Sequence, residues 1–304
     1  MSAQNVSVRR LSVVDIAKLH ADGVRIATIT AYDYPTAALV DEAGIPLILV
    51  GDSLAQVVLG YDTTVRVSME EMLHHTKAVV RGTRRAMIVG DMPFLSYASA
   101  DDAVANAGRF LREAGAQAVK IEGGVRSTRT IEALVRAGIP VMGHIGLTPQ
   151  AINTLGRVRI QGKSKDQARA LLADALAVQD AGAFAVVLEL VPGQLAQTIT
   201  TRLHIPTIGI GAGAGCSGQI QVINDTLGWG EWIPKHARKY ADLRGTILGA
   251  VSQYRADVEA GTFPGDEETV LMDPAILDDV LGRSGADRAD LVRELIGIPL
   301  DRDL

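Results

Sequence analysis

Polar residues stand at the ends of several apolar runs in this sequence. The segment LILVGDSLAQVVLGYDTT (47–64) leads from four apolar residues directly into Gly51, Asp52 and Ser53. The same pattern gives Asp91 in RAMIVGD (85–91), Lys120 and Glu122 in AVKIEGG (118–124), His144 in PVMGHIG (140–146) and Glu189 in FAVVLEL (184–190). Because burying an isolated charge is costly, these side chains need partners, and their types indicate a chemical site.

The carboxylates of Asp52, Asp91 and Glu122 suit a hard cation. The chain has a single cysteine and no cysteine-rich motif, so oxygen ligands favour Mg2+ over Zn2+, with waters and substrate completing an octahedron. A divalent ion held in this way can chelate the carboxylate and keto oxygen of a 2-oxo acid. Lys120 would help to stabilise the negative charge that develops on that oxygen when a neighbouring carbon loses a proton.

The same chemistry requires a base and a group that holds the substrate. Glu189 ends the second apolar run after the one that holds Lys120 and Glu122. It has apolar neighbours and is the candidate base. Ser53 and nearby backbone amides are candidates for holding the substrate carboxylate.

Each of these residues also has a structural explanation. Asp52 or Asp91 could cap the next helix, Lys120 and Glu122 could form a structural ion pair, and His144 could be a satisfied core histidine. For the structural explanations to be right, all of these unrelated polar residues would have to lie on one face of the fold by coincidence. Together they are therefore less favoured than a common chemical site. A non-catalytic role, in assembly or regulation, is disfavoured for a related reason, because unpaired acids would serve no purpose there.

Short runs rich in Val and Ile predict the strands that position these residues. Most are continuously apolar, as in parallel strands buried on both faces. The eight runs are 26–32, 46–52, 85–91, 118–124, 140–146, 184–190, 206–212 and 219–225. Helical segments alternate with them, for instance 68–82, 98–115 and 164–182.

An Ala-Gly pair precedes four of the predicted strands, in EAGIPLILVGD, EAGAQAVKIEGG, RAGIPVMGHIG and DAGAFAVVLELV. Glycine at this position suits a left-handed helix end, so each copy indicates one helix-to-strand unit. Eight such units predict a single α/β TIM barrel, (β/α)8, whose strands deliver their carboxyl ends to one active-site face.

The predicted barrel domain spans 1–264 and begins with an extra helix at 12–23. The C-terminal helical extension spans 265–304 and contains PAILDDVLGRS and RADLVRELIG.

Composition narrows the function classes. The 30 Lys and Arg residues against 35 Asp and Glu give a net charge of -5, and no basic block is present, which disfavours nucleic-acid or membrane-surface binding. No signal peptide or apolar run of about 20 residues is evident, and the lone Cys216 excludes an internal disulfide. We therefore expect a cytoplasmic protein with a small-molecule substrate and neither nucleic-acid nor membrane partners.

Between residues 8 and 264 the sequence resembles the ketopantoate hydroxymethyltransferase family, of the phosphoenolpyruvate mutase and isocitrate lyase barrel superfamily. The matching stretches are TAYDYPTA, ILVGDSLAQVVLGYDTT, MLHHTKAV, DMPFLSY, AVKIEGG, AGIPVMGHIGLTPQ, VLELVP, IPTIGIGAG and KYADL. The resemblance implies transfer of a one-carbon unit from 5,10-methylenetetrahydrofolate to 3-methyl-2-oxobutanoate, giving 2-dehydropantoate and tetrahydrofolate in the first step of pantothenate synthesis.

By matched position, the resemblance implies a role for each candidate. Asp52 and Asp91 would ligate Mg2+ directly and Glu122 mainly through water, Ser53, Asp91 and Lys120 would contact the 2-oxo acid, His144 would hydrogen-bond near it, and Glu189 would accept the proton. It also implies a homo-oligomer, often a decamer. The alternative is a folate-independent carbon–carbon lyase or aldolase of the same superfamily that acts on another 2-oxo acid.

The sequence departs from the family pattern late in the barrel, at LGRVRIQG (155–162), GAGAGCSGQ (211–219), NDTLG (224–228) and His236. In the same region, Trp229 and Trp232 either line a pocket for a flat ring or cover the barrel rim. The metal and enolate residues lie outside these departures, which concern loops that could shape the folate pocket or subunit contacts.

Overall fold

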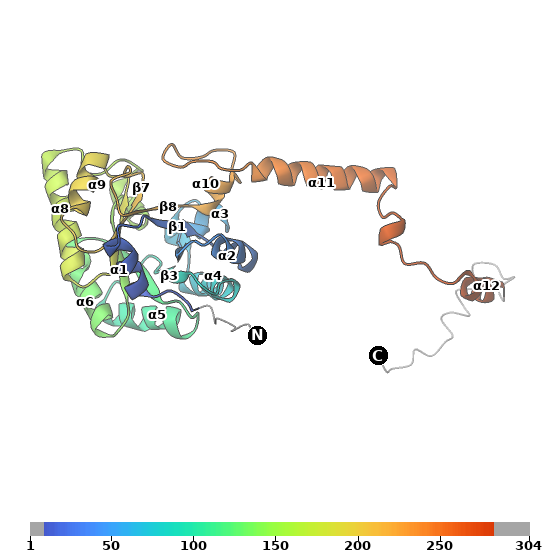
Figure 1. The fold of residues 1–304 in the computed structure, drawn as a ribbon, viewed down its shortest axis with the longest axis horizontal. Coiled ribbons are helices and arrows are strands. Elements are labelled where there is room, and N and C mark those ends of the chain that lie inside the picture. Colours follow the sequence, from blue (N-terminus) through green and yellow to red (C-terminus); the bar gives the residue numbers. More distant parts are fainter. Residues whose placement is uncertain (1–8, 283–304) are drawn as a thin grey trace, which may run out of the picture. The chain divides into compact units, whose positions relative to one another are not determined.

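The computed structural model describes residues 9–282 and contains a closed barrel of eight parallel strands (Figure 1). The strands follow one another around the barrel in sequence order, and β8 pairs with β1. They are β1 (Ile26–Thr30), β2 (Leu47–Val50), β3 (Met87–Asp91), β4 (Ala118–Glu122), β5 (Val141–Gly146), β6 (Ala185–Glu189), β7 (Thr207–Ile210) and β8 (Gly218–Gln221). The predicted TIM barrel and all eight predicted strands are confirmed.

Helices alternate with the strands along the chain. The α-helices of the barrel region are α1 (Val13–Ala21), α2 (Tyr34–Glu42), α3 (Leu54–Val57), α4 (Met69–Gly82), α5 (Ala100–Arg112), α6 (Thr128–Arg136), α7 (Ile152–Leu155), α8 (Lys165–Asp180), α9 (Gly193–Thr200) and α10 (Ile223–Leu227). Short 3-10 turns lie at η1 (Thr64–Arg66), η2 (Val125–Ser127) and η3 (Pro149–Ala151). Across residues 9–282, no helix combines the length and apolarity needed to cross a membrane.

The repeated Ala-Gly pairs form the helix ends that the sequence predicts. Gly44, Gly115, Gly138 and Gly182 have φ angles of +83°, +79°, +80° and +97°. Only glycine adopts this left-handed conformation without steric cost, so each glycine turns the chain from a helix into the next buried strand.

Alternate residues of the strands fill the barrel interior. Those in its lower layers are apolar, namely Ile26, Leu47, Leu49, Met87, Val89, Ala118, Met142, Ala185, Val187, Ile208 and Ile220. Ile16 of α1 packs against this cluster and is fully buried. The interior is therefore a packed core, and the polar ends of the strands form the opposite, carboxyl-terminal mouth.

The chain divides into two compact units, Met1–Arg244 and Gly245–Leu304. The barrel lies in the first. The division falls after Arg244, earlier in the chain than the domain boundary expected after residue 264. The expected boundary stays a prediction. The second unit holds most of α11 (Leu243–Ala260), the 3-10 turn η4 (Asp266–Glu268) and α12 (Pro274–Gly282). Of the two predicted tail segments, α12 matches the first, and RADLVRELIG lies outside the described residues.

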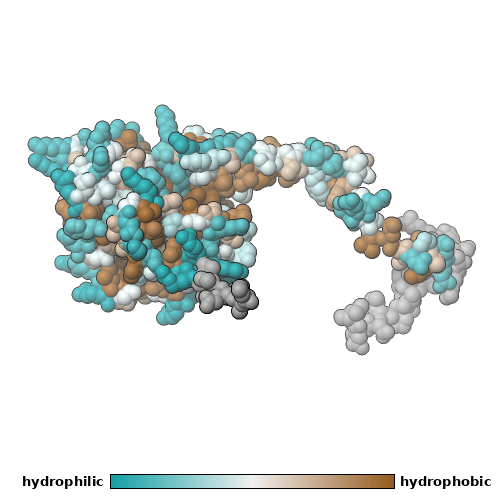
Figure 2. Space-filling view, viewed as in Figure 1, coloured by the Kyte–Doolittle hydropathy of each residue, from teal (hydrophilic) through white to brown (hydrophobic). Residues whose placement is uncertain are grey.

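Helix α11 carries an exposed apolar stripe, visible as brown patches along it in Figure 2. Its members are Ile247, Leu248, Val251, Tyr254 and Val258, all between 39% and 60% exposed. Their spacing places them on one side of the helix, and no residue of α11 is buried.

Candidate active site

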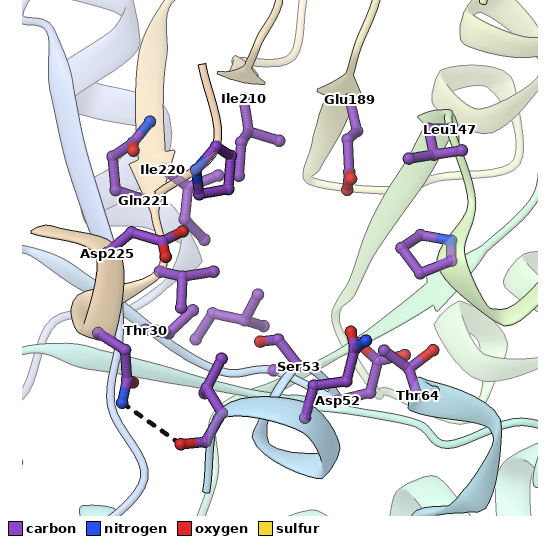
Figure 3. A pocket seen from close by; sticks show the side chains of 18 of the residues that line it. Thr30, Asp52, Ser53, Thr64, Leu147, Glu189, Ile210, Ile220, Gln221 and Asp225 are labelled. Atoms are coloured by element: carbon purple, nitrogen blue, oxygen red, sulfur yellow. Dashed lines mark hydrogen bonds between the residues drawn. The ribbon is translucent and has the colours of Figure 1, made fainter. Parts of the chain in front are cut away.

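A cavity of about 720 Å³ opens at the carboxyl-terminal mouth of the barrel. Six of the seven candidate residues line it, namely Asp52, Ser53, Asp91, Lys120, His144 and Glu189. Figure 3 shows Glu189 pointing into the cavity from β6, across from Asp52 and Ser53, which follow β2. Glu122 is not among the lining residues and contacts His144 and the Gln150 backbone instead. The structure therefore brings the predicted residues together, with Glu122 supporting the others through these contacts.

Asp91 and Lys120 form a buried ion pair at the centre of this group. The parallel register places Asp91 of β3 directly beside Lys120 of β4, and Lys120 Nζ donates to Asp91 Oδ1 at 2.7 Å. The Asp52 backbone N–H donates to Asp91 Oδ2 at 3.1 Å. Burial raises the pKa of Asp91, with Lys120 opposing the shift. Burial alone would lower the pKa of Lys120, but the surrounding carboxylates, Asp91 foremost, raise it, so Lys120 keeps its charge.

Two of the structural alternatives differ from what the structure shows. Ser53, not Asp52, occupies the N-cap position of α3, and Lys120 pairs with Asp91 rather than with Glu122. Ser53 Oγ shares a hydrogen bond of 2.8 Å with the Tyr32 hydroxyl, which fixes the serine at the cavity surface.

Gln150 is a central residue of the site that we did not predict. Its Nε2 donates to Asp52 Oδ2 at 3.0 Å and to the Met92 carbonyl at 2.9 Å, and its backbone N–H donates to Glu122 Oε2 at 3.1 Å. The Tyr97 hydroxyl donates to Gln150 Oε1 at 2.5 Å. Gln150 lies in η3 after β5. Its sequence signal is the TPQ that ends AGIPVMGHIGLTPQ, but its partners come from segments distant in the sequence.

His144 links two of the carboxylates. Its Nδ1 lies 3.4 Å from Glu122 Oε1 and its Nε2 lies 3.1 Å from Glu189 Oε2, both within ion-pair distance but outside hydrogen-bond geometry. Burial and the charge of Lys120 lower the pKa of His144, but the two glutamates outweigh them and raise it to about 9. The two glutamates therefore favour the protonated form of His144. We call Asp52, Asp91, Lys120, Glu122, His144 and Glu189 the acid cluster.

The backbone around Glu189 is tightly constrained. Gly146 pairs with Glu189 across β5 and β6 and has a φ of +94°. A Cβ at this glycine would lie 2.3 Å from the Glu189 carbonyl oxygen. Leu190, next in the chain, has a φ of +47°, a conformation that costs about 1–2 kcal/mol for a residue with a Cβ. Close packing and local strain together hold Glu189 at the mouth, where its side chain is 17% exposed.

The other side of the cavity is formed by β8 and the segment that follows it. It comprises Gln221, Asn224, Asp225, Trp229, Trp232 and His236, which we call the aromatic wall. Trp229 and Trp232 are 50% and 74% exposed. Of the two interpretations of these tryptophans, the structure supports the lining of a pocket.

The acid cluster has the charge of a divalent-cation site. Its four carboxylates face only two cations, Lys120 and His144. Among residues 9–282, no three His, Cys, Asp or Glu side chains converge closely enough to enclose an ion by themselves. Asp52 and Asp91 nevertheless both line the cavity, with the Asp52 backbone N–H bonded to the Asp91 carboxylate, and Mg2+ commonly binds through one or two carboxylates while waters and substrate complete its shell. These two residues therefore fit Mg2+, with Glu122 placed to act indirectly.

Comparisons with known proteins agree with this geometry. The family model described as ketopantoate hydroxymethyltransferase matches residues 10–266. A protein of Chloroflexus aurantiacus named 3-methyl-2-oxobutanoate hydroxymethyltransferase is 61% identical over 274 residues, which cover 90% of this chain and 97% of the relative. A protein of the same name from Dehalococcoides mccartyi is 53% identical over 273 residues, covering 89% and 98%.

Solved structures share the barrel at low sequence identity. The fold is similar to 2,3-dimethylmalate lyase of the PEP mutase/isocitrate lyase superfamily, with a TM-score of 0.53, 18% identity and coverage of 94% of this chain and 99% of the lyase. A structure of phosphoenolpyruvate phosphomutase from Streptomyces platensis gives a TM-score of 0.56 at 18% identity, covering 90% of this chain and 96% of that chain. The match of the family model over most of the chain, together with relatives above half identity, shows that the chain belongs to the ketopantoate hydroxymethyltransferase family.

Proposed function

We propose that this enzyme forms 2-dehydropantoate by transferring the one-carbon unit of 5,10-methylenetetrahydrofolate to 3-methyl-2-oxobutanoate through an enolate. The observation that carries the proposal is the position of Glu189 across the cavity from Asp52 (Figure 3), which is bonded to the Asp91–Lys120 ion pair. This arrangement leaves room between a base and a charged cluster for a small 2-oxo acid.

Each residue contributes a separate task. Glu189 accepts the proton from C3 of the 2-oxo acid, and His144, 3.1 Å away, stabilises the carboxylate before that transfer. Lys120 and the polar group of Ser53 orient the anionic substrate. Because Lys120 is 3% exposed, its charge is little screened by water and acts strongly on the developing enolate oxygen.

Asp52 and Asp91 are the proposed ligands of Mg2+, and Glu122 supports them through Gln150. When bound, Mg2+ supplies positive charge to the keto and carboxylate oxygens of the substrate, which lowers the cost of forming the enolate.

The overall reaction balances with one water. The C3–H electron pair becomes the new bond between C3 and the one-carbon unit, and the C3 proton goes to Glu189. Both bonds from that carbon to the folate nitrogens break, water supplies the hydroxyl oxygen, and tetrahydrofolate leaves with the protons that its nitrogens require.

The deciding experiment is NMR detection of 2-dehydropantoate from 3-methyl-2-oxobutanoate and 5,10-methylenetetrahydrofolate, with Mg2+ and with EDTA. We expect product only when both folate and metal are present. Metal-dependent loss of the C3 proton in heavy water without any product would keep the enolate site but favour the alternative, a lyase or aldolase that uses another electrophile.

Self-association is also part of the proposal. The exposed apolar stripe on α11 supports it, because extended apolar surface in contact with water usually marks an interaction site. Light scattering coupled to size exclusion would show a homo-oligomer, a decamer by family resemblance, whereas a monomer would contradict this part.

The cytoplasmic localisation likewise stays a proposal, which cell fractionation would test.

A further inference from the structure

The aromatic wall carries polar groups that the proposed enolate chemistry does not use. The cavity is much larger than a five-carbon acid requires, and about 720 Å³ falls within the range typical of pockets for larger ligands. The residues of the acid cluster account for one side only. The opposite side therefore has room for a second molecule.

Two amide oxygens of this wall lack hydrogen-bond donors within the described part of the chain. Gln221 Oε1 and Asn224 Oδ1 are buried and have no hydrogen-bond partner among the described residues. The Asp225 carboxylate lines the cavity and points into it in Figure 3. Burial raises the pKa of Asp225, opposed only by the charge of His236. Unpaired acceptors in a partly desolvated wall are unfavourable until a ligand supplies donors.

Trp229 and Trp232 give the same wall two large ring systems. Both line the cavity, and both are exposed by half or more. Indole rings left in water beside a cavity offer stacking surfaces for a planar ligand. The apolar side chain of Ile220 lies beside Asp225 in Figure 3, so the ligand edge that meets this carboxylate would be partly desolvated.

These features select the chemical class of the ligand. The Asp225 carboxylate repels anions, which excludes a carboxylate or phosphate group at this place. A flat heterocycle with two adjacent N–H donors on one edge can bond to the Asp225 carboxylate and stack on the indole rings. The 2-amino-4-oxopteridine head of a folate has such an edge, in its ring N3–H and its 2-amino group.

We propose that the aromatic wall binds the pteridine ring of the folate, with Asp225 accepting hydrogen bonds from the N3–H and 2-amino edge and the tryptophans stacking on the ring. This inference rests on the proposed function, and it assigns the folate to one side of the cavity and the 2-oxo acid to the other. Asp225 is then a specificity-determining residue for the one-carbon donor.

The test measures binding of 5-formyltetrahydrofolate, a stable reduced folate, to the full chain by calorimetry with Mg2+ and 3-methyl-2-oxobutanoate present. Asp225→Asn replaces one acceptor oxygen with a donor amide that faces the donor edge of the ring, so we expect affinity to fall at least tenfold. Because Trp229 and Trp232 are the only tryptophans in the chain, binding should also quench the intrinsic fluorescence.

Asp62→Asn is the matched control. Asp62 lines the same cavity, but its carboxylate is paired with Arg66 at 3.1 Å, so its loss should change affinity by less than twofold. Equal affinity of wild type and Asp225→Asn, or no fluorescence change on binding, would overturn the pteridine assignment. The proposed function would survive that result if the wild type still made 2-dehydropantoate from 5,10-methylenetetrahydrofolate. If the wild type neither bound 5-formyltetrahydrofolate nor made that product, the proposed function would fail together with the inference.

Discussion

The acid cluster and the aromatic wall face each other across one cavity but differ in what surrounds their polar groups. Three buried atoms of the acid cluster, Glu122 Oε1 and the two ring nitrogens of His144, lack hydrogen bonds among residues 9–282 but lie within ion-pair distance of an oppositely charged partner. Every member of the acid cluster lies within hydrogen-bond or ion-pair distance of another member. The aromatic wall instead contains two buried amide oxygens without donors and two exposed indoles.

This contrast indicates which side of the cavity has its final geometry before a ligand binds. The acid cluster is fixed by the fold, with strand register and hydrogen bonds setting its geometry before substrate arrives, as electrostatic catalysis requires. The aromatic wall becomes complete only when a ligand supplies donors and covers the rings. The largest effects of substitution on chemistry should therefore come from the acid cluster, and substitutions in the aromatic wall should leave folding nearly unchanged.

The largest expected effect is that of Glu189→Gln. The amide cannot accept the C3 proton, so metal-dependent exchange of that proton in heavy water should slow by about 100-fold to 10,000-fold. NMR of 3-methyl-2-oxobutanoate measures the rate directly. Glu132→Gln, the same change on the exposed surface of α6, should exchange at the wild-type rate. If Glu189→Gln exchanged normally, the base would have to be another residue.

Asp91→Asn should have the next largest effect, on metal binding. It removes one of two direct ligands, so we expect Mg2+ affinity measured by calorimetry to fall by more than about 100-fold, beyond the range seen when an indirect support is lost. Asp180→Asn, at the exposed end of α8, is the charge-matched control. Wild-type affinity in Asp91→Asn would disprove the ligand assignment.

The acid cluster also shows how far the sequence could predict the site. Strand ends were predictable because apolar runs define parallel strands and their carboxyl ends share one face. The partner of Lys120 was not predictable, because a single sequence suggests Glu122, two residues away. The register between β3 and β4 instead brings Asp91 beside Lys120. Pairing between strands depends on the stagger of the closed barrel, which residue types do not encode locally.

Gln150 and the arrangement of the aromatic wall could not be predicted from the sequence. Gln150 bonds to residues from three other segments, and a loop residue of this kind has no periodicity that could reveal it. For Trp229 and Trp232, the sequence left two interpretations open because only the folded segment shows which side of the rim the rings cover.

Gln150→Leu should have an intermediate effect. Gln150 joins Asp52 to Glu122, and Leu keeps the backbone bond to Glu122 but loses the side-chain bond that orients Asp52. We expect Mg2+ affinity to fall about tenfold, as for other residues that orient a metal ligand. Gln194→Leu on the exposed face of α9 should bind Mg2+ as the wild type does. Unchanged affinity in Gln150→Leu would mean that the fold holds Asp52 without this bond.

The smallest expected effect is the loss of protein stability when a residue of the aromatic wall is replaced. Trp232 is 74% exposed, so Trp232→Ala removes little buried surface, and the free energy of unfolding should change by no more than about 0.5 kcal/mol. Urea unfolding of the ligand-free protein measures it, and Gln150→Leu in the same assay should lose more, because the buried Asp52 oxygen then lacks its donor. When 5-formyltetrahydrofolate is added, the wild type should gain stability by mass action and Trp232→Ala should gain less. A large loss of stability in ligand-free Trp232→Ala would show instead that the indole is part of the folded framework, and the two sides of the cavity would then be built alike.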